Sequence, residues 1–142
     1  MIHRAILRLT GGRLGLRRAT DGQWGMMRLT IVGRRSGQQR QAILGYFEDG
    51  PNLVTMAMNG WGDPEPAWWL NLQANPDATV GLADGPRLVH GRAATPAERP
   101  RLWSRWAKYD GEEKLASWAS RRSRETAVVI LEPRAGSRAH PG

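Results

Sequence analysis

The sequence of 142 residues contains no cysteine, and its three histidines are far apart. The absence of cysteine excludes disulfides, thiolate nucleophiles, iron–sulfur clusters and cysteine-ligated zinc. Because His3, His90 and His140 are scattered, a histidine-rich metal site or a histidine-centred catalytic triad is poorly supported. The sequence also has no apolar run of about 18 residues, the length that a membrane-spanning helix needs. We therefore expect neither a metal centre nor a membrane span.

Negative charge is scarce, and positive charge is carried almost entirely by arginine. The 21 Lys+Arg residues outnumber the 13 Asp+Glu residues, which gives a net charge of +8, and only Lys108 and Lys114 are lysines. This balance is compatible with nucleic acid, an anionic membrane surface, a small anionic ligand, or a solvated surface without a ligand. A phosphate or carboxylate needs only a few arginines in one place, because each guanidinium presents a planar fork of donors.

The two ends of the chain carry weaker signals than its middle. The length and the absence of internal repeats favour one domain over residues 1–133. Within it, residues 1–16 alternate apolar residues with arginine and predict a short amphipathic helix. This segment lacks the features of a secretory signal, so we expect a cytoplasmic protein, with contact to a membrane surface left open. Residues 134–142 are expected to form a disordered tail.

Alternating apolar residues and turn signals predict an antiparallel sheet. Strands are expected over residues 26–32, 38–48, 53–58, 78–83, 87–94 and 126–131. In the first of these, Met27, Leu29 and Ile31 fall on one face. An antiparallel sheet hides its edges best when it closes on itself. The predicted fold is therefore mainly β with peripheral helices (α+β), a split β-barrel of about six antiparallel strands.

Short helices are expected between the later strands. One covers residues 67–74, and another continues from about residue 111 to about residue 122. Between them, Thr95 and Glu98 have the spacing of a capping box, with Pro96 at the first helical position of a helix that ends near Lys108. We expect the later helices to pack outside the barrel.

The first candidate site is the arginine-rich segment 33–40, which joins the first two strands. Glycines at both ends allow positive φ angles, so successive backbone N–H groups could point into one anion-binding concavity. Arg34, Arg35 and the Ser36 hydroxyl would add donors, and Arg40 could reach back along the strands. The alternative is an exposed hairpin turn with solvated arginines. It is not a Walker loop, because the Lys-Ser/Thr ending and the following helix are missing.

The second candidate site is residues 59–75, where three of the seven tryptophans fall within nine residues. Adjacent Trp68 and Trp69 point about 100° apart on a helix, so at most one should face the core fully. The other should lie in a pocket, at an interface or on a partner. The segment is therefore suited to form an aromatic wall for a planar ring system.

The chain, in these two segments and in two others, resembles the deazaflavin-dependent nitroreductase family, small split-barrel reductases that use coenzyme F420. The similarity lies in a Gly-Gly-Arg-Leu-Gly stretch (11–15), a Thr-x-x-Gly-Arg-Arg-Ser-Gly-Gln-x-Arg element (30–40), a Pro-x-Trp-Trp-x-Asn-Leu-x-Ala-Asn-Pro element (66–76) and a closing Arg-to-Glu-Pro element (124–133). The resemblance covers nearly the whole chain. It implies a split β-barrel and hydride transfer from reduced F420 to an electron-poor acceptor such as a quinone, enone or nitro compound.

The resemblance also implies a set of cofactor-binding residues. They are Arg34, Arg35, Ser36, Gly37, Arg40, Gln41, Ala42, Ile43, Leu44, Met56, Ala57, Met58, Asn59, Ala67, Trp68, Trp69, Leu70 and Asn71. Residues 34–40 would hold the phosphate and the start of the glutamate tail, and residues 41–44 would line the ribityl chain and the ring. Residues 56–59 would contact the ring through backbone groups, and residues 67–71 would close its other side. No catalytic acid or base is demanded, because the cofactor carries the hydride.

The acceptor pocket is where the chain departs from the pattern of the family. Relatives often carry tyrosines where this sequence has Leu115 and Trp118, and indole does not deliver protons readily. We expect Trp24, Leu115 and Trp118 to shape this pocket. The protein is expected to be a monomer or a homodimer.

Other functions remain compatible with the sequence. FMN could replace F420, as it does in related split barrels, although three arginines are more charge than one phosphate needs. A hydrophobic-ligand or lipid binder without turnover is another alternative. A nucleic-acid-binding barrel is disfavoured, because the basic residues are spread over loops, strands and both ends.

Overall fold

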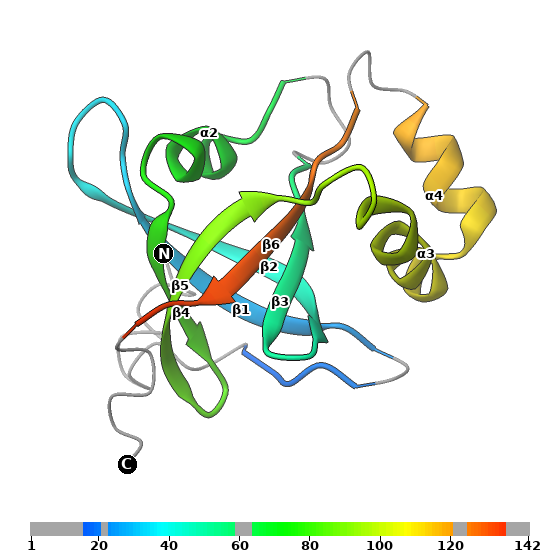
Figure 1. Ribbon diagram of the computed structural model, residues 1–142, viewed down its shortest axis with the longest axis horizontal. Coiled ribbons are helices and arrows are strands. Elements are labelled where there is room, and N and C mark those ends of the chain that lie inside the picture. Colours follow the sequence, from blue (N-terminus) through cyan, green and yellow to red (C-terminus); the bar gives the residue numbers. More distant parts are fainter. Residues whose placement is uncertain (1–15, 21–22, 59–63, 121–124, 136–142) are drawn as a thin grey trace, which may run out of the picture.

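The computed structural model describes residues 16–20, 23–58, 64–120 and 125–135. The expected N-terminal helix and residues 136–142 of the expected tail lie outside this part of the chain. Figure 1 shows the elements, which are β1 (Gly25–Val32), β2 (Gln39–Asp49), β3 (Asn52–Met56), α2 (Ala67–Ala74), β4 (Asp77–Leu82), β5 (Gly85–Ala93), α3 (Arg99–Asp110), α4 (Glu112–Ala119) and β6 (Val128–Pro133).

The strands close into a barrel in the order β1-β2-β3-β6-β5-β4, and all neighbours are antiparallel. Leu29 illustrates the closure, because it pairs with Ala42 of β2 on one side and with Val80 of β4 on the other. The predicted antiparallel barrel is therefore confirmed. Met27, Leu29 and Ile31 are at most 2% exposed, so the predicted inward face of β1 is confirmed too.

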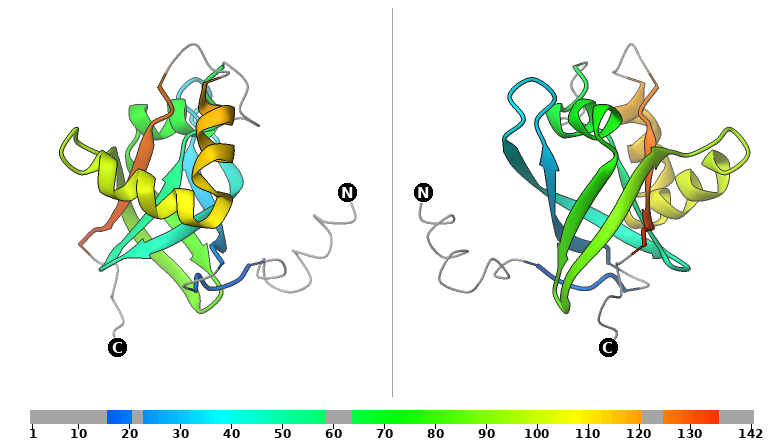
Figure 2. Two further views of the ribbon diagram at one scale, coloured as in Figure 1. Left: turned by 90° about the vertical axis from the view of Figure 1, so that its right-hand side faces the viewer. Right: turned by 60° about the vertical axis from the view of Figure 1, so that its left-hand side comes forward.

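A second apolar layer lies outside the barrel, between the sheet and the two later helices. Phe47 of β2, Met56 of β3 and Ile130 of β6 contribute to it from the strands, and Trp106 of α3 and Leu115 of α4 contribute from the helices. Figure 2 shows α3 and α4 together on one side of the barrel. The predicted packing of the late helices against the outside of the sheet is confirmed.

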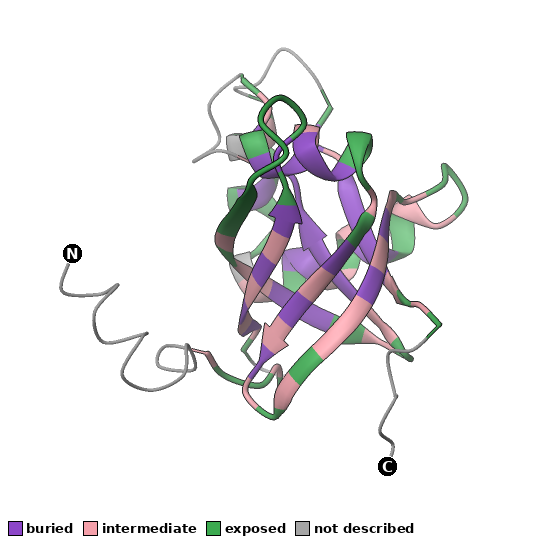
Figure 3. Ribbon diagram, turned by 90° about the vertical axis from the view of Figure 1, so that its left-hand side faces the viewer, coloured by how far each residue is buried: buried purple, intermediate pink, exposed green. Residues whose placement is uncertain are grey.

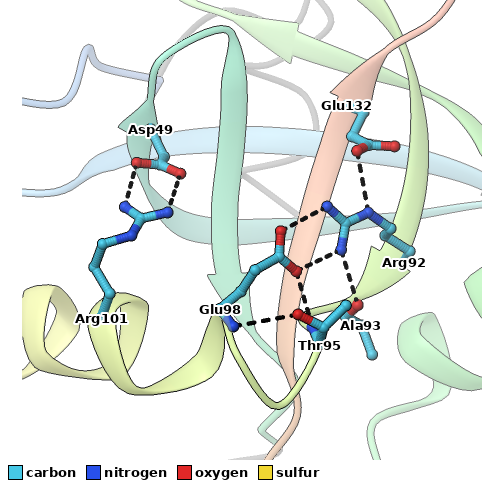
Figure 4. Close-up of polar contacts among 7 residues, drawn as sticks. All are labelled: Asp49, Arg92, Ala93, Thr95, Glu98, Arg101 and Glu132. Atoms are coloured by element: carbon cyan, nitrogen blue, oxygen red, sulfur yellow. Dashed lines mark hydrogen bonds and ion pairs between the residues drawn. The ribbon is translucent and has the colours of Figure 1, made fainter.

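The capping box forms, but it does not begin the helix as predicted. The Thr95 N–H donates to Glu98 Oε1 (2.8 Å), and the Glu98 N–H donates to Thr95 Oγ1 (3.2 Å). These bonds close a turn, and α3 starts after it with Pro100 in its first turn, so the start at Pro96 was wrong. The reason is visible in Figure 4: Glu98 also binds Arg92 of β5 at 2.8 and 3.0 Å, which holds the turn against the barrel.

Helix α2 spans residues 67–74, as predicted, and lies across one end of the barrel. Its Leu72 is completely buried and packs against Gly91 of β5. A Cβ atom on Gly91 would lie 2.5 Å from Leu72 Cδ2, so the helix can approach the strand this closely only because residue 91 is glycine. The Gly91 N–H also donates to the Pro76 carbonyl at 2.8 Å, which fixes the chain just beyond the helix.

Candidate functional site

A cavity of about 380 Å³ lies between the β1–β2 turn and α2. In Figure 2 the turn and the helix stand at the same end of the barrel. The cavity is lined by Ile31, Gly33, Arg34, Arg35, Ser36, Arg40, Gln41, Ala67, Trp68 and Asn71. Two segments separated by about 30 residues therefore meet at one site, and eight of these ten residues belong to the predicted cofactor-binding set.

The β1–β2 turn is held by its own backbone. The Gly33 N–H donates to the Gln38 carbonyl (2.7 Å), and the Gly37 N–H donates to the Gly33 carbonyl (3.0 Å). Gly37 adopts a φ of 73°, as expected for a turn glycine. Gly33 has no positive φ, so that expectation was wrong. The missing side chain matters there because a Cβ would lie 3.1 Å from Ser36 Oγ.

The predicted concavity of backbone N–H groups is only partly present. The N–H groups of Gly33 and Gly37 are used within the turn, and that of Gln38 donates to Ser36 Oγ at 3.1 Å. The Arg34 N–H donates to Asn71 Oδ1 at 3.0 Å. These donors are satisfied inside the protein and cannot also hold an anion at full strength. An anionic ligand would therefore be met mainly by side chains.

The side chains of the turn supply that positive charge. Arg34 Nη1 donates to Asn71 Oδ1 (2.8 Å), and Arg40 Nη2 donates to Ser36 Oγ (3.4 Å), so Arg40 does reach back as expected. Arg35 has no hydrogen-bond partner within the described part of the chain. The three guanidinium groups form no ion pair with the described carboxylates. Figure 3 shows the turn exposed beside α2, so their charge is open to a ligand.

Both tryptophans of α2 are buried, and they divide as expected: Trp69 does not line the cavity, whereas Trp68 does. Trp68 is 9% exposed and Trp69 is 4% exposed, and their rings meet edge to face with centroids 6.2 Å apart. A helix that closes the end of a barrel can bury a wider arc than one that lies on a flat sheet. Because Trp68 lines the cavity, it is placed where the predicted aromatic wall requires it.

Other predicted cofactor-binding residues lie away from this cavity. Ala42, Leu44, Ala57 and Trp69 belong to the barrel interior or pack against it, whereas Ile43 is 41% exposed on the outside. Gly37, Met56, Met58 and Leu70 also belong to the predicted cofactor-binding set, and none of them lines this cavity. Asn59 lies outside the described residues.

The residues expected at the acceptor pocket lie on the α3–α4 side of the barrel. The ring of Trp24 lies 4.5 Å from that of Trp106 and 5.3 Å from that of Tyr109, centroid to centroid. Leu115 is completely buried in the same apolar layer. Trp118 belongs to α4, and its side chain lies outside the described part. None of the three lines the cavity between the turn and α2.

Two cavity-lining residues lie outside the predicted cofactor-binding set: Gly33, which begins the candidate segment 33–40, and Ile31, which no candidate segment included. Ile31 is the last inward-facing residue of β1 before the turn, and it pairs with Arg40 of β2. Residues at the end of a barrel strand border the barrel mouth, so the alternation of β1 contained the signal for Ile31.

A second cavity, of about 480 Å³, has a different character. Its charged lining residues are Arg18, Glu48, Asp84 and Arg87, so opposite charges balance. It has no aromatic lining side chain among the described residues. The cavity beside α2 is the smaller one, yet its uncompensated positive charge and its tryptophan suit a ligand with an anionic tail and a planar ring.

Comparison with known proteins identifies a family with such a ligand. Residues 1–133 match the family described as F420H(2)-dependent quinone reductase. The chain belongs to this family. An F420H(2)-dependent quinone reductase of Mycobacterium tuberculosis (strain H37Rv) is 34% identical over 139 residues, which cover 94% of this chain and 89% of the relative. The family resemblance of the sequence, with its F420-dependent reductase activity, is thereby confirmed at the level of the family.

Solved structures support the fold of this family member. A structure described as a domain-swapped dimer covers 92% of this chain and 96% of its own, with a TM-score of 0.70 and 21% identity. An F420-H2-dependent reductase covers 75% and 93%, with a TM-score of 0.66 and 24% identity. At these identities the similarity concerns the fold alone.

The cavity fits the cofactor of the family in its chemistry. Three cationic side chains and a hydroxyl line the cavity and could bind an anionic phosphate and glutamate tail. Trp68 lines the same cavity and could offer an apolar face to a planar ring. Within the described residues, no helix is long and apolar enough to cross a bilayer.

Proposed function

We propose that this chain reduces small electron-poor acceptors of the quinone class with F420H2, and that the cavity beside α2 holds the anionic part of the cofactor. The observation that carries the proposal is the convergence of Arg34, Arg35 and Arg40 with Trp68 on one cavity of about 380 Å³. Neither segment could form this site alone, since the turn supplies charge and α2 supplies the aromatic surface.

Each part of the site has a physical role. Arg35 and Arg40 bind the phosphate and the glutamate tail by charge-assisted hydrogen bonds. Trp68 packs against the cofactor and excludes water. When bound, reduced F420 supplies the hydride, so the protein has to position cofactor and acceptor rather than provide a nucleophile.

The remaining predicted residues, as far as the structure describes them, do not line this cavity, and their part in the proposed site is an extension beyond it. Residues 42–44 of β2 and residues 56–59, which begin at the last residue of β3, would continue the cofactor site, and Trp24, Leu115 and Trp118 would shape the acceptor side. Quinones, enones and nitro compounds are all candidate acceptors, because each accepts a hydride at an electron-poor centre.

The proposal is tested by titrating the purified protein with oxidised and reduced F420 and following tryptophan fluorescence. Binding in the low micromolar range and quinone-dependent oxidation of F420H2 are expected. Arg35→Ala should weaken binding roughly tenfold, because a charge-assisted hydrogen bond is lost. Arg87→Ala removes an arginine from the other cavity and should leave affinity unchanged. No binding at tens of micromolar, or a yellow protein that carries FMN, would contradict the proposal.

A further inference from the structure

Asn71 differs from the other polar residues that line the cavity, because its side chain is almost completely buried. It is 6% exposed, and its Oδ1 accepts hydrogen bonds from the Arg34 backbone N–H (3.0 Å) and from Arg34 Nη1 (2.8 Å). Both partners are donors, so the amide oxygen and not the amide nitrogen must face Arg34. These two bonds use both lone pairs of Oδ1, which leaves this atom no capacity for a ligand.

The position of Asn71 is itself set by the barrel. Its neighbour Leu72 is completely buried and is seated against Gly91 of β5. Helix α2 therefore connects the barrel wall to the turn, whose arginines are otherwise exposed. Arg34 thus gains a fixed direction that Arg35, which has no partner among the described residues, does not have.

The acceptor on α2 is neutral, and this has a consequence for the charge of the site. A carboxylate at position 71 could accept the same two hydrogen bonds, but its charge would cancel that of the guanidinium. An amide holds the guanidinium and leaves its positive charge available to an anion. Part of the rotamer entropy of the arginine is then already lost before a ligand binds, which favours binding.

We propose that Asn71 is a positioning residue that acts through Arg34: it directs the Arg34 guanidinium toward the anionic group of the ligand without neutralising it. This inference rests on the proposed function, and it assigns Asn71 a role other than contact with the cofactor through Oδ1. It also separates the three arginines: Arg34 is anchored on α2, Arg40 is anchored only on Ser36 of the exposed turn, and Arg35 has no hydrogen-bond partner among the described residues.

A double-mutant cycle tests whether Asn71 acts through Arg34. Asn71→Leu should weaken the affinity for oxidised F420 roughly tenfold, as the loss of a hydrogen bond to a charged group does. In an Arg34→Ala background the same substitution should have little further effect. Additive effects, or unchanged affinity in Asn71→Leu, would overturn the inference. Gln73→Leu, on an exposed position of the same helix, is the matched control and should bind F420 with unchanged affinity.

Asn71→Asp separates position from charge. This variant keeps both hydrogen bonds, so protection of the Arg34 N–H from hydrogen exchange should persist, whereas affinity for oxidised F420 should fall roughly tenfold. Asn71→Leu should lose both the protection of the Arg34 N–H and the affinity for oxidised F420. Protection that survives in Asn71→Leu, or undiminished affinity in Asn71→Asp, would contradict the inference. If the wild-type protein does not bind F420, the proposed function fails instead, while the exchange measurement still reports on the Asn71–Arg34 contact.

Discussion

At the scale of single residues, Trp106 is the most unusual member of the second apolar layer. It is 1% exposed, and its Nε1–H has no acceptor within the described part of the chain. Trp106→Phe removes that unsatisfied donor, which offsets the lost packing against Trp24. We expect the free energy of unfolding to change by less than about 1 kcal/mol, against a loss of about 3–5 kcal/mol for Trp106→Ala. Urea denaturation measures both, and a large loss in Trp106→Phe would show that the N–H has a partner in solution.

The residues of the site could be predicted from the sequence where they belong to short contiguous motifs. The arginines of the β1–β2 turn and Trp68 stand in motifs that the sequence displays directly. The contact between Asn71 and Arg34 joins residues 37 positions apart and depends on how α2 docks, so no local pattern contains it. The sequence also could not predict that several backbone N–H groups of the turn donate to acceptors within the protein, because those hydrogen bonds depend on the folded conformation of the turn.

At the scale of elements, the docking of α2 depends on Gly91. Gly91→Ala places a methyl group 2.5 Å from Leu72 Cδ2, so the buried Leu72 side chain must move, which displaces the helix that carries Asn71. We expect a loss of about 1–3 kcal/mol in unfolding free energy, the usual cost of overpacking, together with weaker F420 binding. Leu72→Val in the same chain should restore part of both. The control is Gly45→Ala, whose Cβ would make an ordinary 3.6 Å contact with Trp24; an equal loss in this variant would exclude the specific clash.

At the scale of the whole molecule, the sequence predicted the strands better than their closure. Alternation and turn residues locate β1, β2 and β3, and the order of these strands in the sheet follows from their short connections. The pairing of β3 with β6 joins residues such as Thr55 and Val129, which no local signal connects. The barrel was inferred instead from the need to hide sheet edges. The start of α3 was misplaced because the ion pair of Glu98 with Arg92 is a tertiary contact.

Two ion pairs, Glu98 with Arg92 and Asp49 with Arg101, hold α3 and the turn before it against the barrel. They should make the stability of the whole molecule depend on pH. The Arg92 guanidinium lowers the pKa of Glu98 to about 2, and hydrogen bonding to Arg101 lowers the pKa of Asp49 (Figure 4). A carboxyl group with a depressed pKa stabilises the fold above its unfolded-state pKa and loses this contribution as pH falls through its folded-state pKa. Urea midpoints should therefore fall between about pH 4.5 and pH 2. Glu98→Gln should be less stable than wild type at pH 7 and should show a shallower decline, whereas Asp84→Asn, at an exposed position, should follow the wild-type curve. A Glu98→Gln curve parallel to that of wild type would show that this pair does not couple α3 to the barrel.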